Sequence, residues 1–125
     1  MPPKFGMVFA ALKPVLATQA GRLVVKTDTP TEYTLVTKAA SPFPQHKGQP
    51  MWFGSVRAGK AYVSFHLMAL YFNPALAGMI SPALQKRMQG KTCFNFKSDP
   101  DPSQLAELKH LTSVAVEQWA KQHYL

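Results

Sequence analysis

Residues 50–68, PMWFGSVRAGKAYVSFHLM, predict one β-hairpin whose alternate positions form two chemically different faces. The dipeptide Ala58-Gly59 lies near the middle and predicts the turn of a β-hairpin. A two-residue and a four-residue turn at this point give the same assignment of side chains to faces. The apolar face is expected to lie in the core, with Trp52, Gly54 and Val56 opposite Phe65, Val63 and Ala61.

The other face of this hairpin mixes apolar and polar side chains. It is expected to carry Met51, Phe53, Ser55, Tyr62, Ser64, His66 and Met68. Such a surface either receives a covering helix or forms the wall of a ligand pocket, and no catalytic motif in the sequence selects between them. The pocket hypothesis assigns ligand binding to Phe53, Tyr62, Ser64 and His66.

Helical and strand patterns precede the hairpin. An apolar stripe at helical spacing predicts a first helix that ends at Gly21, and the stripe consists of Phe5, Phe9, Leu12 and Leu16. The runs 22–28 and 33–38, joined by a turn at Thr29 and Pro30, predict a first β-hairpin. A proline-bearing surface loop is expected over residues 41–50.

Two short helices are predicted after the central hairpin, because each has a polar N-cap residue followed by proline. The first begins at Asn73 and ends at Gly78, and the second begins at Ser81 and ends at Gly90. Residues 92–97 then predict a strand whose core-facing side chains are Thr92, Phe94 and Phe96.

A long amphipathic helix closes the chain. Asp101, Pro102 and Gln104 form a favourable helix start. The apolar stripe that follows is Leu105, Leu108, Leu111, Ala115 and Trp119. The whole pattern predicts one domain over residues 1–125, an α/β (α+β) two-layer sandwich. Its antiparallel sheet has about five strands, with the N- and C-terminal helices packed on it.

Composition narrows the classes of function. Hydrophobic residues make up 46% of the 125 residues and charged residues 16%, which excludes an intrinsically disordered chain. The formal net charge of +8 favours anionic partners, either a small organic or anionic ligand or nucleic acid. A single cysteine, Cys93, excludes an internal disulfide and predicts a cytoplasmic protein. No membrane association is expected, because the stretch from Phe5 to Leu16 is interrupted and falls short of the ~20 residues of a spanning helix. The oligomeric state does not follow from the sequence.

Clustered cations provide the best candidate for anion binding. Lys86, Arg87 and Lys91 lie near the predicted end of a short helix, where cations also complement the helix dipole. Aromatic residues near positive charge suggest a stacking platform for bases, formed by Trp52, Phe53 and Tyr62 with Arg57 and Lys60. No RNA-recognition or helix-turn-helix motif accompanies them, so nucleic-acid binding is the alternative to the small-ligand hypothesis.

Metal and catalytic sites have little support in the sequence. No pair of histidines has the spacing of a zinc site, so no metal and no cofactor is predicted. Cys93 and His66 would form a thiolate pair only if their strands are neighbours, and the sequence offers no third orienting group. We therefore predict a non-enzymatic binding domain, and a Cys/His enzyme is the third hypothesis.

The string MWFGSVRAGKAYVSFHLM, followed by ISPALQKRMQGKTCFNFK and an amphipathic C-terminal helix, resembles the YdhG-like family of small, mostly uncharacterised bacterial domains. The similarity is strongest over residues 50–97 and covers about two-thirds of the chain by pattern. The resemblance implies a compact α/β domain similar in layout to frataxin. Some relatives are described as iron chaperones, a function that relies on clustered carboxylates. This chain has only six scattered acidic residues, so we expect no tight binding of iron.

Overall fold

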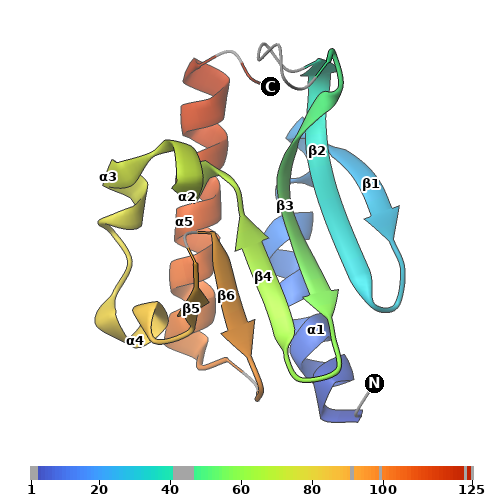
Figure 1. Ribbon diagram of the computed structural model, residues 1–125, viewed down its shortest axis with the longest axis vertical. Coiled ribbons are helices and arrows are strands. Elements are labelled where there is room, and N and C mark those ends of the chain that lie inside the picture. Colours follow the sequence, from blue (N-terminus) through green and yellow to red (C-terminus); the bar gives the residue numbers. More distant parts are fainter. Residues whose placement is uncertain (1–2, 41–46, 91, 99, 123, 125) are drawn as a thin grey trace.

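The computed structural model describes residues 3–40, 47–90, 92–98, 100–122 and 124. A six-stranded antiparallel sheet forms one layer, with the strand order β1-β2-β3-β4-β6-β5 (Figure 1). Two long helices, α1 (Pro3–Ala17) and α5 (Pro102–Lys121), lie behind this sheet and form the second layer. The predicted two-layer α+β architecture is confirmed, with one strand more than expected.

The remaining elements follow the chain in a simple order. The strands are β1 (Val24–Asp28), β2 (Glu32–Ala40), β3 (Pro50–Ala58), β4 (Val63–Leu67), β5 (Met88–Gln89) and β6 (Cys93–Phe96). The short helices are η1 (Ala20–Arg22), α2 (Ala69–Phe72), α3 (Pro74–Ala77) and α4 (Pro82–Gln85). The predicted loop 41–50 lies largely outside the described residues.

The core fills the space between the sheet and the two long helices. Phe65 and Phe94 from neighbouring strands are fully buried, with ring centroids 6.4 Å apart. Trp119 of α5 is 1% exposed and meets the Phe53 ring edge to face at 5.2 Å. From α1, the buried apolar side chains include Phe9, Leu12 and Leu16. The predicted burial of Phe65, Phe94 and Trp119 is therefore confirmed, and the side chain of Phe5 lies outside the described part.

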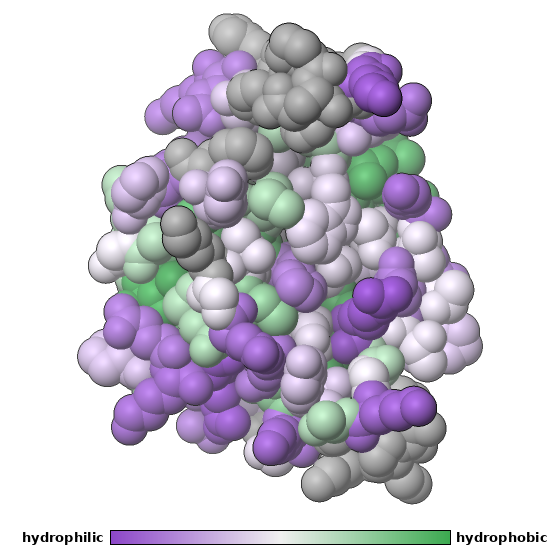
Figure 2. All heavy atoms as spheres, in the orientation of Figure 1, coloured by the Kyte–Doolittle hydropathy of each residue, from purple (hydrophilic) through white to green (hydrophobic). Residues whose placement is uncertain are grey.

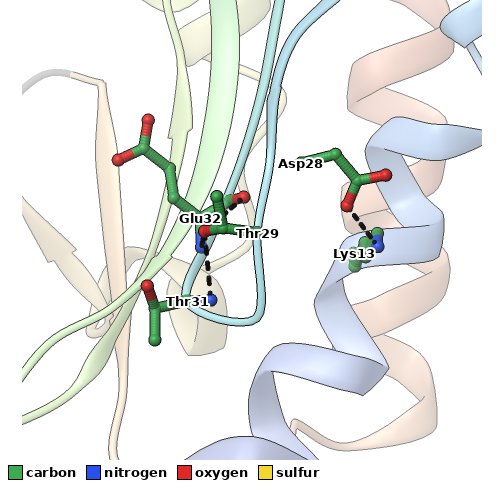
Figure 3. A network of polar contacts seen from close by, with 5 residues as sticks. All are labelled: Lys13, Asp28, Thr29, Thr31 and Glu32. Carbon is green, nitrogen blue, oxygen red and sulfur yellow. Dashed lines mark hydrogen bonds and ion pairs between the residues drawn. The ribbon is translucent and has the colours of Figure 1, made fainter.

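The first hairpin forms as predicted, because its turn satisfies its own backbone groups. The Thr29 hydroxyl accepts hydrogen bonds from the backbone N–H groups of Thr31 at 3.3 Å and Glu32 at 3.0 Å (Figure 3). Lys13 of α1 donates to the carboxylate of Asp28 at 2.8 Å, which joins the helix to the end of β1. The turn closes the hairpin through local hydrogen bonds, and the ion pair connects its end with α1 at the surface.

A β-bulge in β3 inverts the predicted faces of three residues. Leu35 pairs with Gly54, whereas its neighbour Val36 pairs with Trp52, so Phe53 is an extra residue in β3. Trp52 consequently turns to the face away from the helices, where it lines a hollow of the sheet, and only part of it is buried. Met51 and Phe53 are 2% and 0% exposed and belong to the core. The predictions of a core Trp52 and of a ligand-facing Met51 and Phe53 were wrong.

The pairing register of the central hairpin differs by four residues from the predicted one, because Val56 pairs with Phe65 and not with Ala61. Ala58 pairs with Val63, which leaves residues 59–62 as the loop, and the Gly59 N–H donates to the Tyr62 carbonyl at 2.9 Å. Val56 still faces the core beside Phe65, because the shift is by an even number of residues. Tyr62 therefore precedes β4 instead of lying on a strand.

The proline-containing helix starts are confirmed. The Asn73 side chain accepts from the Ala75 N–H at 3.1 Å, and the Ser81 hydroxyl accepts from the Leu84 N–H at 3.3 Å. The second helix, however, ends at Gln85 and not at Gly90. Residues 88–89 form the short strand β5 on β6 instead, and Gly90 follows it with φ +77°. Asp101 and Gln104 form the predicted capping box of α5.

Candidate functional site: an open basic trough

The sheet face opposite α1 and α5 is crossed by none of the described helices (Figure 1). Side chains at alternate positions of the strands project from it, as the strand pairing requires. Ser55 and His66 face each other across β3 and β4, and His66 lies opposite Cys93 across β4 and β6. Figure 2 views the molecule from this side and shows hydrophilic residues interspersed with pale ones and with smaller groups of hydrophobic residues.

Three hollows on this face adjoin one another, and together we call them the trough. The first, of about 390 Å³, lies over β1 to β4 and includes Trp52, Ser55 and His66 in its lining. The second, of about 540 Å³, surrounds the β3–β4 loop and shares Arg57 and His66 with the first. The third, of about 480 Å³, shares Tyr62 with the second and extends to the residues between α4 and β6. The trough thus crosses the sheet from β1 to β5.

Positive charge predominates along the trough. The basic residues in its lining are Lys26, Arg57, Lys60, Lys86, Arg87 and Lys97. Glu32 is the one acidic residue in the lining among the described residues, and its carboxylate lies 3.3 Å from Arg57 Nε. Because the Arg57 side chain is 70% exposed, this ion pair is weak and leaves the guanidinium accessible to a ligand.

Most of the remaining acidic residues in the described ranges are engaged away from the trough. Asp28 pairs with Lys13, and Glu117 pairs with Arg22 at 2.6 Å. Glu107 accepts hydrogen bonds from both the backbone N–H and the hydroxyl of Ser81, at 2.7 and 2.6 Å. These interactions keep three carboxylates away from the trough, so Glu32 alone among the described acidic residues opposes its six cations.

An aromatic pair lies on the floor of the first hollow. The ring centroids of Trp52 and His66 are 5.4 Å apart, and the two rings are inclined at 52°. Burial lowers the pKa of His66 below its ordinary value of 6.5, and the positive charge of Arg57 lowers it further. His66 is therefore a neutral imidazole at pH 7, although it lies within a basic surface.

A row of hydrogen bonds connects β4, β6 and β5 on the same face. The side-chain oxygen of Asn95 accepts from the Ser64 hydroxyl at 3.3 Å and from the Cys93 thiol at 3.2 Å. The Asn95 amide donates to the side-chain oxygen of Gln89 at 2.6 Å. Burial raises the pKa of Cys93, and a hydrogen bond with Ser64 lowers it in part. Cys93 and His66 are neighbours, as a thiolate pair would require, but burial favours the neutral thiol.

Five of the predicted ligand-binding residues meet along the trough. Tyr62, Ser64 and His66 line the second hollow, and Lys86, Arg87 and Tyr62 line the third. Phe53 is fully buried on the opposite side of the sheet, because the bulge turns it toward Trp119. Lys91, the last of the predicted group, lies outside the described residues.

The surroundings of the basic cluster differ from the predicted helix end. Lys86 is the C-cap residue of α4, and Arg87 lies beyond it, on the turn into β5. The Arg87 guanidinium lies over the Phe96 ring, 5.6 Å from the ring centroid. Arg87 also lines the third hollow, at the end of the trough.

Several residues that line the trough were not predicted from the sequence. Lys26 and Glu32 were not connected with the hairpin, because their proximity depends on the pairing of β1 and β2 with β3. Asn95 and Lys97 did carry a signal, since both alternate with the buried residues Phe94 and Phe96. Trp52 gave a misleading signal, because its face depends on the bulge.

Within the described ranges, no three histidine, cysteine, aspartate or glutamate side chains are grouped so that they could hold a metal ion. The described helices include none with the length and apolar character needed to cross a bilayer.

No family model, curated protein or solved structure matches this chain. The resemblance to the YdhG-like family therefore stays a prediction.

Proposed function

We propose that this protein binds single-stranded nucleic acid along the trough, without catalysing a reaction on it. The observation that carries the proposal is the continuity of three hollows whose lining contains six cations and one carboxylate. Proteins that bind single strands combine a positively charged groove with aromatic side chains on which bases stack. Trp52 and Tyr62 are half-buried in the trough and supply this second component.

The dimensions of the trough suit a short segment of a strand. Six strands spaced about 4.8 Å apart span roughly 24 Å. Binding sites of single-stranded nucleic acid begin at about four nucleotides per small β domain. Cations lie at both ends of the trough, with Lys26 on β1 and Lys86 beside β5. A phosphate backbone that crosses the strands would meet positive charge along its whole length.

A small organic or anionic ligand is the second candidate. The observation that favours it is the hollow beside Tyr62, Ser64 and His66, where hydrogen-bonding groups stand next to an aromatic ring. Pockets for small ligands commonly enclose 70–90% of the ligand surface. The hollows of the trough open widely to solvent, so an extended ligand that lies across the sheet suits them better.

Fluorescence anisotropy with a labelled ten-nucleotide single strand tests the proposal. We expect binding that weakens steeply with salt, because each phosphate contact to a single strand contributes roughly 0.7 to the slope of log K against log salt. Replacing Lys60 or Lys97 by glutamate should lower affinity and reduce that slope by about one contact. Lys109→Glu is the matched control, because Lys109 is exposed on α5, behind the sheet.

These titrations distinguish single-strand binding along the trough from binding of a small ligand in one hollow. Equal loss of affinity in Lys109→Glu and Lys60→Glu would show that net charge, and not the trough, governs binding. Competition by mononucleotides at the same nucleotide concentration as the oligonucleotide would favour a small ligand in one hollow. The absence of any binding to the single strand at low salt would exclude the proposed function.

A further inference from the structure

His66 differs from the other ligand-facing groups of the trough, because its two ring nitrogens have different surroundings. Nδ1 is buried and has no hydrogen-bond partner among the described residues. Nε2 is the ring nitrogen that a ligand in the trough can reach, since the side chain is partly exposed and lines both the first and the second hollow. The ring also contacts Trp52.

This geometry selects one tautomer of the imidazole. A buried N–H without an acceptor is more costly than an acceptor nitrogen without a donor, so the proton belongs on Nε2. A second proton would place an unpaired N–H at the buried Nδ1, which disfavours the imidazolium. The low pKa of His66, caused by burial and by Arg57, agrees with this argument. The charged or titratable groups that line the two hollows around it are Lys26, Glu32, Arg57, Lys60 and Tyr62. Cys93 lies opposite His66 on β6.

We propose that His66 is a specificity-determining residue that donates its Nε2–H, as a neutral imidazole, to an acceptor atom on the edge of a base stacked against Trp52. The inference rests on the proposed binding of single-stranded nucleic acid. The cations around the trough supply sequence-independent attraction for phosphates, whereas a neutral donor has no such preference for charge. The contact with Trp52 places this donor beside the stacking surface, where a base edge would lie.

The variants for the test separate the donor from the ring. His66→Gln places an amide N–H near the position of Nε2, and His66→Leu has no donor. The probe is a labelled ten-nucleotide oligothymidine, whose bases carry carbonyl oxygens, and the comparison is an abasic strand of equal length. We expect His66→Leu to weaken binding to oligothymidine roughly tenfold, the factor for one hydrogen bond. His66→Gln should stay within about threefold of the wild type.

Two further readouts keep the inference falsifiable. The salt slope should be unchanged in His66→Leu, and the abasic strand should bind wild type and His66→Leu equally. An equal loss on both strands would assign the contact to phosphate and overturn the proposal. Should His66→Leu fail to fold, His66→Asn is the substitute, because its shorter amide does not reach the Nε2 position and should show the same loss.

NMR of the free protein tests the tautomer without any ligand. The nitrogen chemical shifts of the His66 ring should show a proton on Nε2 and none on Nδ1 at pH 7. A proton on Nδ1, or affinity that rises on acidification in the wild type but not in His66→Gln, would overturn the proposal. If wild type binds neither strand, the proposed function fails. If it binds oligothymidine and His66→Leu binds equally well, only this inference fails.

Discussion

The two faces of the sheet differ although they belong to the same strands. On β4, Val63, Phe65 and Leu67 face the helices and are fully buried. Ser64 and His66, which alternate with them, face the trough. Ser64 donates a hydrogen bond to Asn95, and His66 contacts the partly exposed ring of Trp52. Burial of apolar surface stabilises the covered face, whereas polar groups on the open face contribute less to folding. Stability and binding are therefore expected to respond to different residues of one strand.

Phe65→Ala should give the largest loss of stability, about 3–5 kcal/mol, because a fully buried ring would leave a cavity between β4 and the helices. Urea denaturation followed by circular dichroism measures this. Ser64→Ala is the neighbouring control on the open face and should cost far less. A loss below about 1 kcal/mol for Phe65→Ala would show that the covered face is not the tightly packed one.

Gly54→Ala tests the bulge that separates the faces. An added Cβ would lie 2.6 Å from the His66 carbonyl oxygen and 3.4 Å from Leu16, so the strands or α1 must shift. We expect a loss of about 1–3 kcal/mol by thermal or urea unfolding. Gly21→Ala is the control, because no described atom beyond its chain neighbours lies within 4 Å of its added Cβ. Equal effects of the two substitutions would contradict the close approach of β3 and β4.

Trp52→Ala should separate binding from stability most clearly. The half-buried ring contacts His66, and losing this aromatic pair costs about 0.5–1.5 kcal/mol of folding stability beyond the contribution of the apolar area that the ring buries. Loss of a base-stacking surface costs about 1–3 kcal/mol of binding. Parallel anisotropy titrations and unfolding curves measure both quantities. Trp119→Ala is the comparison on the covered face and should destabilise the fold more than Trp52→Ala. A smaller loss of stability in Trp119→Ala would contradict the placement of Trp119 in the core and of Trp52 in the trough.

His66 should cause the smallest effect, visible as a pH dependence. Its pKa in the folded protein lies below the ordinary 6.5, so the unfolded chain takes up more protons as the pH falls through 6.5. Stability should therefore decline on acidification from pH 7.5 and be fully present above the unfolded pKa. His66→Gln removes this contribution, so the difference in unfolding free energy between the proteins should change with pH. A difference that is constant from pH 7.5 to 5 would contradict the lowered pKa.

Local chemistry explains the parts of the fold that the sequence determined by itself. Asn73 and Ser81 cap helices through their own side chains, within three residues, and no distant contact is needed. Phe94 and Phe96 alternate with polar residues, so their burial and the exposure of Lys97 follow from the period of a strand. The closing helix follows from the stripe that ends in Trp119 for the same reason.

Only the tertiary structure decided the faces around Trp52 and the membership of the trough. The strand pattern of β3 is compatible with unbroken alternation, and the bulge appears only when β2 pairs with Gly54 at one residue and Trp52 at the next. Burying Phe53 against Trp119 then places Trp52 beside His66. Lys26 and Lys86 are 60 residues apart in the chain, and they join one basic surface because strand pairing, a non-local interaction, orders the sheet.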